Sequence, residues 1–226
     1  GFYRLLLQHL EWLRVRNFSE ETVRSRWVYV RHFALWCLER DLFQPASITK
    51  PILESFQRWL YRKRKANGEP LSWTSQYLHL KEVRLFFAWL ARHNHLPFSP
   101  AAELELPRQP KSLPKAILSE DEVEKILAQP DANTLLGLRD RAILETFYST
   151  GIRRTELCRL KIDDIQVDRQ SLFVHQGKGK KDRYVPIGMR ALVWIARYAE
   201  QSRDRLLLDP KERTLFVSNV GDPLHP

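Results

Sequence analysis

Apolar side chains recur at steps of three and four through the first 95 residues, which is the spacing of one face of an α-helix. Ser19 suits a helix N-cap because its hydroxyl can accept a hydrogen bond from an unpaired backbone N–H group. Glu20 and Glu21 follow in the first turn, where the helix dipole favours negative charge. The first part of the chain is therefore expected to be a compact all-α domain. The pattern predicts four helices, over Phe2–Val15, from Ser19, from Thr49 to the Asn67-Gly68 pair, and over about residues 72–93.

A proline-rich stretch follows these helices. Five prolines fall within 18 residues, from Pro97 to Pro114, so neither a helix nor a central strand can continue there. An extended linker between two domains is the natural interpretation. The predicted division is a helical domain over residues 1–95, a linker over 96–115 and a second domain over 116–226.

The second domain mixes two periodicities. Ser119 and Glu122 form a predicted capping box at the start of its first helix. Further helices are expected over Leu135–Ser149, ended by Gly151, over Arg153–Leu160 and over Met189–Gln201. Alternating apolar residues predict short strands near residues 165–167, 172–174, 184–187 and 215–217, with residues 177–180 at a hairpin tip. The expected fold class is mainly α: a four-helix domain, then an α+β domain with a small antiparallel sheet.

The charge balance adds a partner to this picture. The 226 residues carry 37 lysines and arginines against 27 aspartates and glutamates, a net charge of +10. Residues 1–110 hold 17 of these basic residues against 10 acidic ones, so most of the surplus lies in the helical domain. Arginines there are interleaved with aromatic residues. This pattern suits contacts with nucleic-acid phosphates, and an ordinary solvated basic face is the alternative.

Composition also excludes several classes of protein. No apolar stretch has the length of a transmembrane helix and no leader-like segment opens the chain, so a soluble protein inside the cell is expected. Cys37 and Cys158 are 121 positions apart and no CxxC motif is present, which argues against a disulfide framework or a cysteine zinc site. His93 and His95 have no third ligand nearby in the sequence, so no metal site is expected.

The segment Thr150-Gly151-Ile152-Arg153-Arg154-Thr155-Glu156-Leu157 is the first candidate for chemistry. Because Gly151 ends one helix and the next begins at once, Arg153 is expected in a first helical turn, beside free backbone N–H groups that favour a phosphate. Glu156 follows three residues later, where it can orient the arginine. A surface ion pair of small energetic weight is the alternative explanation of this spacing.

The second candidate is residues 177–183, Gly-Lys-Gly-Lys-Lys-Asp-Arg, between two predicted strands. A lysine on a short rigid hairpin can reach a backbone phosphate or a leaving-group oxygen. A nucleotide-binding loop is excluded, since no GxxxxGK[ST] motif is present and the glycines lie between strands. A solvated hairpin is the simplest alternative.

Together, in this order and 25 residues apart, the two motifs resemble those of the tyrosine recombinases, the phage-integrase and Xer-like family of site-specific recombinases. Residues 150–157 are similar to that family's TGxRxxEL box, and residues 177–187 are similar to its GKGxKxR hairpin and following strand. Residues 80–90 look like the most typical stretch of the family's core-binding domain. The resemblance covers nearly the whole chain.

The resemblance implies a mechanism without metal or ATP. A tyrosine attacks a DNA phosphodiester, a 3′-phosphotyrosyl link stores the bond energy, and a 5′-hydroxyl leaves. Arg153 matches the catalytic arginine that stabilises charge on the non-bridging oxygens, and Lys178 matches the general acid for the leaving oxygen. Glu156 matches the acidic residue that supports the arginine, whereas Arg154 lies at a position that the family does not fix.

The implied partner is double-stranded DNA. The family resemblance also implies a homo-tetramer acting on two DNA sites, a cytoplasmic location at the nucleoid, and no cofactor or membrane. The side chains expected to contact DNA are Arg24, Arg26, Arg62, Lys63, Arg64, Lys65, Lys81, Arg84, Lys180, Lys181 and Arg183.

The sequence departs from the family pattern at one point. The family continues with an HxxR box and a late nucleophilic tyrosine, whereas these 226 residues end in a segment, Gly221–Pro226, that resembles the one before those boxes. None of the seven tyrosines stands in the nucleophile's context, so the 226 residues are expected not to cleave DNA by themselves. The alternatives are a non-catalytic DNA-binding protein derived from a recombinase and a type IB topoisomerase, against which the Xer-like helical domain argues.

Overall fold

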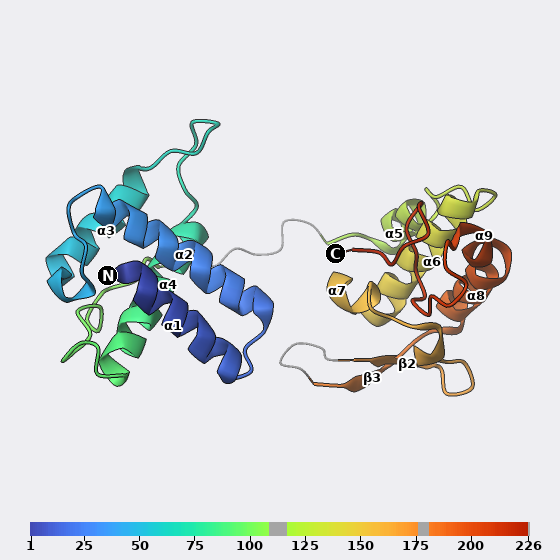
Figure 1. Ribbon diagram of the computed structural model, residues 1–226. Helices are drawn as coiled ribbons and strands as arrows, with labels where there is room; N and C mark the ends of the chain where they lie inside the picture. Colours follow the sequence, from blue (N-terminus) through green and yellow to red (C-terminus); the bar gives the residue numbers. More distant parts are fainter. Residues whose placement is uncertain (109–116, 176–180, 226) are drawn as a thin grey trace. The chain divides into compact units, whose positions relative to one another are not determined.

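The computed structural model describes residues 1–108, 117–175 and 181–225, and the chain separates into two compact units, Gly1–Leu113 and Pro114–Pro226 (Figure 1). Each unit has its own hydrophobic core. The first unit is built from helices, and the second combines helices with a small antiparallel sheet. The predicted fold class is therefore confirmed.

The first unit contains α1 (Phe2–Val15), α2 (Glu20–Leu38), a 3₁₀ turn (Pro45–Ser47), α3 (Lys50–Arg62) and α4 (Trp73–Arg92). Ser19 caps α2 as predicted, since its hydroxyl accepts the amide of Thr22 at 3.3 Å. The apolar helix faces meet in an aromatic core, where the ring of Phe33 contacts those of Phe2 and Phe56 at centroid distances of 5.9 and 4.9 Å. The apolar faces predicted from the sequence are thus the faces that these four helices bury in the core.

The third helix ends earlier than the sequence pattern predicts. It stops at Arg62, after which Arg64 and Pro70 pair as an isolated antiparallel bridge. Gly68 has a φ of 81°, so it turns this small hairpin instead of ending a helix.

The start of the predicted linker belongs to the helical unit. Leu96, Ala101 and Leu104 are buried in the helical core, although prolines stand between and around them. Prolines exclude regular elements, but they leave irregular backbone free to pack apolar side chains. Residues 109–116 of the stretch lie outside the described residues.

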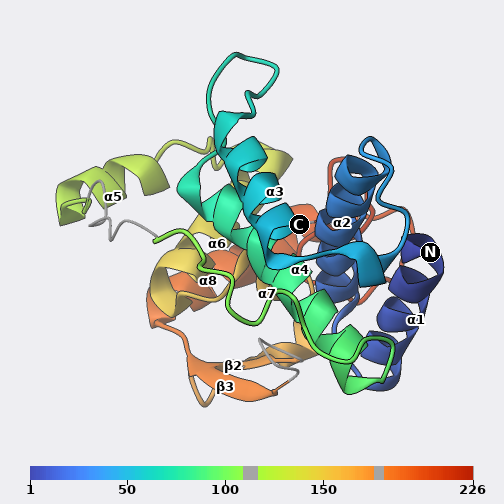
Figure 2. The same cartoon turned by 90° about the vertical axis from the view of Figure 1, so that its left-hand side faces the viewer.

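The second unit contains α5 (Glu120–Leu127), α6 (Leu135–Thr150), α7 (Arg154–Leu157), a 3₁₀ turn (Ile162–Asp164), α8 (Met189–Tyr198), a π-helical turn (Ala199–Arg203) and α9 (Asp204–Leu206). Three antiparallel strands, β1 (Ile165–Gln166), β2 (Ser171–Val174) and β3 (Arg183–Pro186), form one sheet in the order β1-β2-β3. Helices α6 and α8 pack against each other, and the sheet lies to one side of this pair (Figure 2). In the register of β2 and β3, Val174 lies opposite Arg183, so these strands frame the predicted hairpin.

Two predicted elements of the second unit are wrong. Helix α7 has four residues, whereas the pattern predicts a helix up to Leu160. The segment 215–217 forms no strand in the described part of the chain: the buried guanidinium of Arg203 donates to the carbonyl oxygens of Thr214 at 2.7 Å and Leu215 at 3.2 Å. Thr214 and Val217 pair with neighbouring backbone only as isolated bridges, to Lys161 and Pro223, and the Arg203 guanidinium binds carbonyl oxygens of the same segment.

Candidate functional site

Helix α6 ends at the residue that sets up the first motif. Gly151 has a φ of 60°, the left-handed conformation that glycine adopts at a helix C-terminus without a Cβ clash. Helix α7 begins at Arg154, so Arg153 is its N-cap residue and not, as predicted, a residue of its first turn. The Arg153 side chain is 54% exposed, which leaves its guanidinium accessible from solvent.

The buried carboxylate of Glu156 organises this turn. Its Oε2 accepts the backbone N–H of Arg153 at 2.9 Å, and its Oε1 accepts Nη1 of the Arg153 guanidinium at 2.8 Å. The guanidinium of Arg183 on β3 donates to the same two oxygens, through Nη1 to Oε1 at 3.0 Å and through Nη2 to Oε2 at 2.8 Å. The contact expected between Glu156 and Arg153 is therefore present, and Arg183 shares the same carboxylate.

These contacts determine the charge of the site. Hydrogen bonds from Arg183, then from the backbone and side chain of Arg153, lower the pKa of Glu156 to about 2 in spite of its burial. The hydrogen bonds to Glu156 in turn raise the pKa of Arg183 above its usual range. Two guanidinium groups share one carboxylate, so the cluster keeps a net positive charge.

The geometry also changes how this turn can meet a phosphate. The amide of Arg153 is already bonded to Glu156, so that N–H is not one of the free groups predicted from the sequence. The guanidinium of Arg153 is the exposed cation, and Glu156 holds it through Nη1. An oriented, solvent-facing guanidinium is suited to bidentate binding of an anionic oxygen pair.

The hairpin candidates are only partly described. Lys178 and Lys180 lie outside the described residues. Lys181 is exposed, and Arg183 is directed to Glu156, so its expected DNA contact has a competitor inside the protein.

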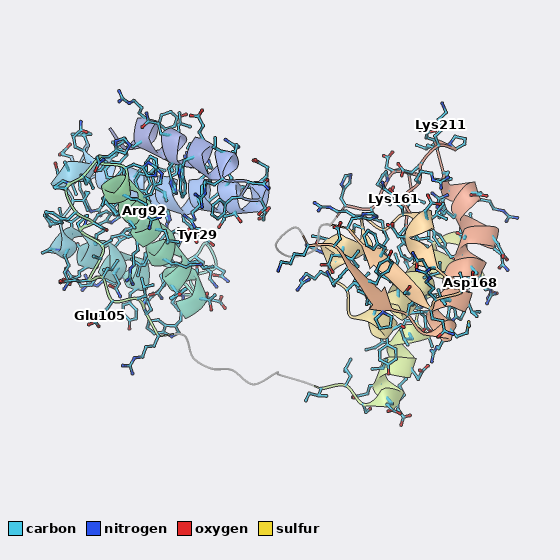
Figure 3. All side chains as sticks on the ribbon, turned by 90° about the horizontal axis from the view of Figure 1, so that it is seen from below. Tyr29, Arg92, Glu105, Lys161, Asp168 and Lys211 are labelled. Carbon is cyan, nitrogen blue, oxygen red and sulfur yellow. The ribbon has the colours of Figure 1, made fainter. Side chains whose placement is uncertain are left out.

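A histidine–aspartate pair stands at the base of the same hairpin. The ring Nε2 of His175 lies 2.6 Å from Oδ1 of the buried Asp164, whose Oδ2 accepts the amide of Lys161 at 2.8 Å (Lys161 is labelled in Figure 3). His175 follows β2 directly and packs edge-on against Phe173 at 4.5 Å. The sequence analysis missed this pair, because its members are 11 positions apart and meet only in the folded unit.

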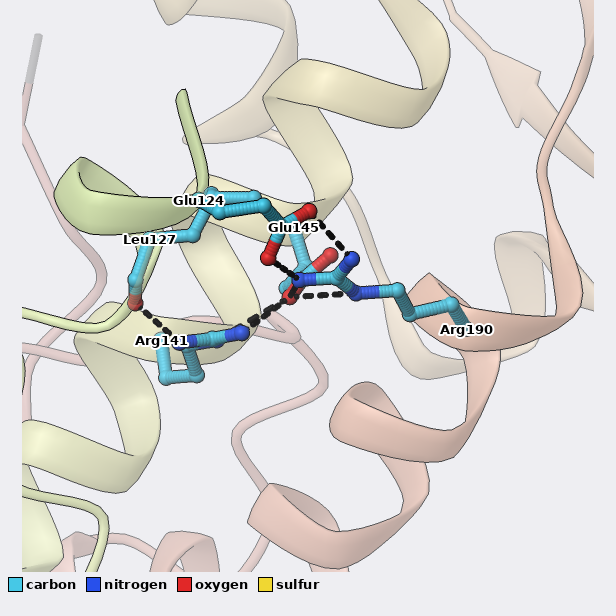
Figure 4. Close-up of polar contacts among 5 residues, drawn as sticks. All are labelled: Glu124, Leu127, Arg141, Glu145 and Arg190. Atoms are coloured by element: carbon cyan, nitrogen blue, oxygen red, sulfur yellow. Dashed lines mark hydrogen bonds and ion pairs between the residues drawn. The ribbon is translucent and has the colours of Figure 1, made fainter. Parts of the chain in front are cut away.

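Helix α6 is held by a network of two arginines and two glutamates (Figure 4). The buried Glu145 accepts hydrogen bonds from Arg141 at 2.7 Å and from Arg190 on α8 at 2.9 Å. Arg190 also forms a bidentate pair with Glu124 of α5 at 2.6 and 2.8 Å, and Arg141 donates to the carbonyl oxygen of Leu127. The network ties α5, α6 and α8 together, and α6 leads directly into Gly151.

The basic residues of the helical unit divide into two groups. Three are engaged within the unit: Arg26 pairs with Glu82, Lys81 with the same glutamate at 3.7 Å, and Lys63 Nζ lies 2.8 Å from His32 Nε2 and over the ring of Trp59. Arg26 is nearly buried, which weakens its case for a phosphate contact. The exposed members of the predicted set are Arg24, Arg62, Arg64, Lys65 and Arg84, of which Lys65 pairs with Glu69.

An exposed aromatic pair lies beside these cations. Tyr61 and Trp73 face each other at a centroid distance of 5.9 Å and line a groove of about 630 Å³ together with Arg58 and Arg62. Trp73 is exposed because it stands at the first position of α4, outside the apolar face of the helix that meets the core. No group of three or more metal-binding side chains occurs among the described residues. Within the same residues, no helix is long and apolar enough to span a membrane.

Comparison with known proteins places this architecture in a family. Residues 116–226 match the model of the phage integrase family, and residues 5–95 match that of the phage integrase N-terminal SAM-like domain. The chain therefore belongs to the phage integrase family, the tyrosine recombinases, as its motifs predict.

The relatives are recombinases of the Xer type. The chain is 48% identical over 223 residues to tyrosine recombinase XerC 2 of Ralstonia nicotianae. The aligned region covers 99% of this chain and 64% of that protein. It thus spans just under two thirds of the length of this curated relative.

Solved recombinases share the fold. The XerH site-specific recombinase bound to a palindromic difH substrate matches with a TM-score of 0.68 and 18% identity, over 93% of this chain and 60% of that one. A lambda integrase tetramer bound to a Holliday junction matches with a TM-score of 0.63 and 18% identity, over 99% of this chain and 61% of that one.

Proposed function

We propose that this protein is a site-specific DNA recombinase of the tyrosine type. In this proposal the helical unit is its core-binding domain, and the second unit carries the phosphate-binding part of its active site. The observation that carries the proposal is the exposed Arg153 guanidinium held by the buried Glu156, in a chain of this family. Such a group is suited to the charge that develops on a phosphodiester during attack.

The roles of the individual side chains follow from this chemistry. Arg153 would stabilise the non-bridging oxygens of the scissile phosphate, and Glu156 would keep the guanidinium in one orientation. Lys178 would protonate the leaving 5′-oxygen as the general acid. The exposed Arg24, Arg62, Arg64, Lys65, Arg84 and Lys181 would contact the DNA backbone and contribute affinity through counterion release.

We propose further that these 226 residues do not cleave DNA by themselves. Tyr198 is fully buried and its hydroxyl accepts the amide of Val217 at 3.3 Å, so it cannot reach a phosphate. Tyr148 and Tyr184 are exposed on α6 and β3, outside any segment that matches the family's nucleophile. The alternative function, a non-catalytic DNA-binding protein derived from a recombinase, requires that no nucleophilic tyrosine follow in the reading frame.

The proposed partner is double-stranded DNA, which places the site of action at the nucleoid. The lambda integrase relative was solved as a tetramer on a Holliday junction. By analogy we propose that the full-length protein acts as a tetramer on two DNA sites.

A suicide DNA substrate tests the function. The 226-residue chain is expected to bind duplex DNA without forming a covalent adduct, whereas a product that continues into an HxxR box and a late tyrosine forms one. Arg153→Gln in the longer product should lower adduct formation by about 10²-fold or more, and Arg169→Gln, at an exposed turn, serves as the matched control. An adduct with the 226-residue chain, or an Arg153→Gln product as active as its parent, contradicts the proposal.

A further inference from the structure

Arg183 has no role in the proposed chemistry, yet it contacts the centre of the site. We propose that Arg183 is a positioning residue, which holds the Glu156 carboxylate so that Arg153 keeps one orientation, and that it does not contact DNA. The inference rests on the proposed function for the meaning of Arg153, while the contacts themselves stand independently of it.

The contact between Arg183 and Glu156 is bidentate. Nη1 and Nη2 of the guanidinium donate to Oε1 and Oε2 at 3.0 and 2.8 Å, the parallel geometry that a planar guanidinium and a carboxylate form with each other. The Glu156 side chain is 5% exposed, and that of Arg183 is 38% exposed. A carboxylate buried to this degree needs its charge balanced, so Arg183 is held at Glu156 and is less available to a phosphate than Arg153.

The carboxylate is saturated by these partners. Two bonds come from Arg183 and two from Arg153, and an ionised carboxylate offers about four acceptor positions. The bonds from Arg153 arise within one turn, three residues from Glu156, and such a local pair orients little by itself. Arg183 supplies the contact from another element, and this contact fixes where the carboxylate lies.

The backbone of Arg183 is fixed in turn by the sheet. Arg183 lies opposite Val174 in the antiparallel pairing of β2 and β3, and Val174 is buried in the core of the second unit. The Arg183 side chain therefore reaches α7 from a strand whose backbone is held by its pairing with β2. Through Glu156, the Arg153 side chain is therefore held by the sheet as well as by the end of α6.

The experiment measures the ionisation of Glu156 in the 226-residue chain by carbon-detected NMR of the labelled carboxyl group. The parent is expected to titrate near pH 2. Arg183→Gln should raise that pKa towards the usual range of a glutamate, Arg183→Lys should raise it less, and Arg169→Gln should leave it unchanged. The side-chain nitrogen signals of Arg153 should broaden in Arg183→Gln, because the guanidinium no longer has a fixed partner.

Duplex DNA binding as a function of salt separates positioning from a phosphate contact. A positioning arginine leaves the slope of log K against log salt unchanged in Arg183→Gln, whereas a lost phosphate contact reduces its magnitude by about 0.9. An unchanged Glu156 pKa, or a slope reduced by that amount, overturns the inference. Where Arg183→Gln does not fold, Arg183→Lys provides the same two readouts.

The two proposals fail in different ways. If the chain binds no DNA at all, the proposed function fails while the Glu156 titration still tests Arg183. If DNA binding is normal and the Glu156 pKa does not respond to Arg183, the positioning role fails alone.

Discussion

The carboxylate of Glu156 joins the arginine turn to strand β3. It is buried, it holds Arg153 through both a backbone and a side-chain bond, and it receives Arg183 from a strand 27 positions away in the chain. Its lowered pKa means that the ionised form of this side chain is more stable in the folded protein than in the unfolded chain. This difference makes the stability of the second unit depend on pH.

Acid should destabilise the second unit through Glu156. The folded pKa is about 2 and the unfolded value is 4.5, so the contribution is complete above about pH 4.5 and is lost as the pH falls towards 2. Urea unfolding between pH 6 and pH 2, followed by the fluorine NMR signal of 5-fluorotryptophan at Trp194, measures it. Trp194 is the only tryptophan after residue 89, so its signal reports on the second unit alone. Glu156→Gln should show a smaller loss across this window, and an identical pH profile contradicts the account.

Gly151→Ala should destabilise the second unit by about 1–2 kcal/mol, the cost of a left-handed conformation for a residue with a Cβ. A Cβ at this position meets no atom within 4 Å, so the effect is one of backbone strain alone. Gly151→Asn is the matched control, because asparagine adopts the left-handed conformation more readily than alanine and should cost less. Chemical denaturation of the two variants checks the order, and equal effects would refute the backbone explanation.

At the scale of elements, polar contacts decide how α5 is held. Leu127 is the only buried side chain of this helix, so little apolar area attaches it. Arg190 and Arg141 reach it from α8 and α6, through Glu124 and the carbonyl oxygen of Leu127. Glu145 lies between the two arginines and balances both charges. Buried charge pairs of this kind lose most when one partner is removed.

Glu145→Gln should therefore destabilise the second unit by about 3–5 kcal/mol, since two guanidinium groups lose a buried counter-charge. Glu124→Gln removes the exposed partner of the same Arg190, and should cost at most about 1 kcal/mol. Urea unfolding of both variants, monitored at Trp194, gives the comparison. The account is contradicted if the exposed glutamate proves as costly as the buried one.

The helical unit should lose stability in mild acid through its enclosed histidines. Burial, followed by Arg26, lowers the pKa of His9 to about 3, and burial, followed by His32 and Lys63, lowers that of His79 to about 4. Unfolded histidine binds protons near pH 6.5, so stability is complete above this pH and falls as the pH decreases towards 4 and 3.

Each histidine contributes at most about 1.4 kcal/mol per pH unit in that range. Tryptophan fluorescence reports this unit, since six of the seven tryptophans lie in it. His79 packs edge-on against Tyr29 at 4.7 Å, so His79→Phe retains an aromatic ring at this position (Tyr29 is labelled in Figure 3). This variant should flatten the pH profile, and equal urea midpoints of the parent at pH 7 and pH 5 would exclude the effect.

Elements were easier to predict than the contacts between them. The helix of Ser72–His93 and the turn at Gly151 are visible in the sequence, because apolar spacing and a helix-ending glycine are local signals. The pairing of Arg183 with Glu156 is not visible, because its members come from different elements and meet only in the folded unit. The same reason hides the burial of Arg203, whose guanidinium meets the backbone of Thr214 only in the folded unit.

At the scale of the whole molecule, the net charge of +10 divides into cations that face solvent and cations that are engaged inside the fold. Arg62 and Arg64 are exposed next to the Tyr61–Trp73 pair. Arg26 carries the same charge, but it is paired with the buried Glu82. A charge in the first group is accessible from solvent to an anionic partner, and a charge in the second is balanced within the helical unit.

The proposed binding of DNA phosphates is tested most directly by the affinity for duplex DNA, measured by fluorescence anisotropy between 50 and 200 mM salt. We predict that log K falls linearly with log salt, and that Arg62→Gln combined with Arg64→Gln reduces the magnitude of the slope by up to about 1.8, or 0.9 for each lost contact. Arg26→Gln should leave the slope unchanged and lower the unfolding midpoint instead. Binding that is indifferent to salt, or a slope that responds to Arg26 and not to the exposed pair, would contradict the account.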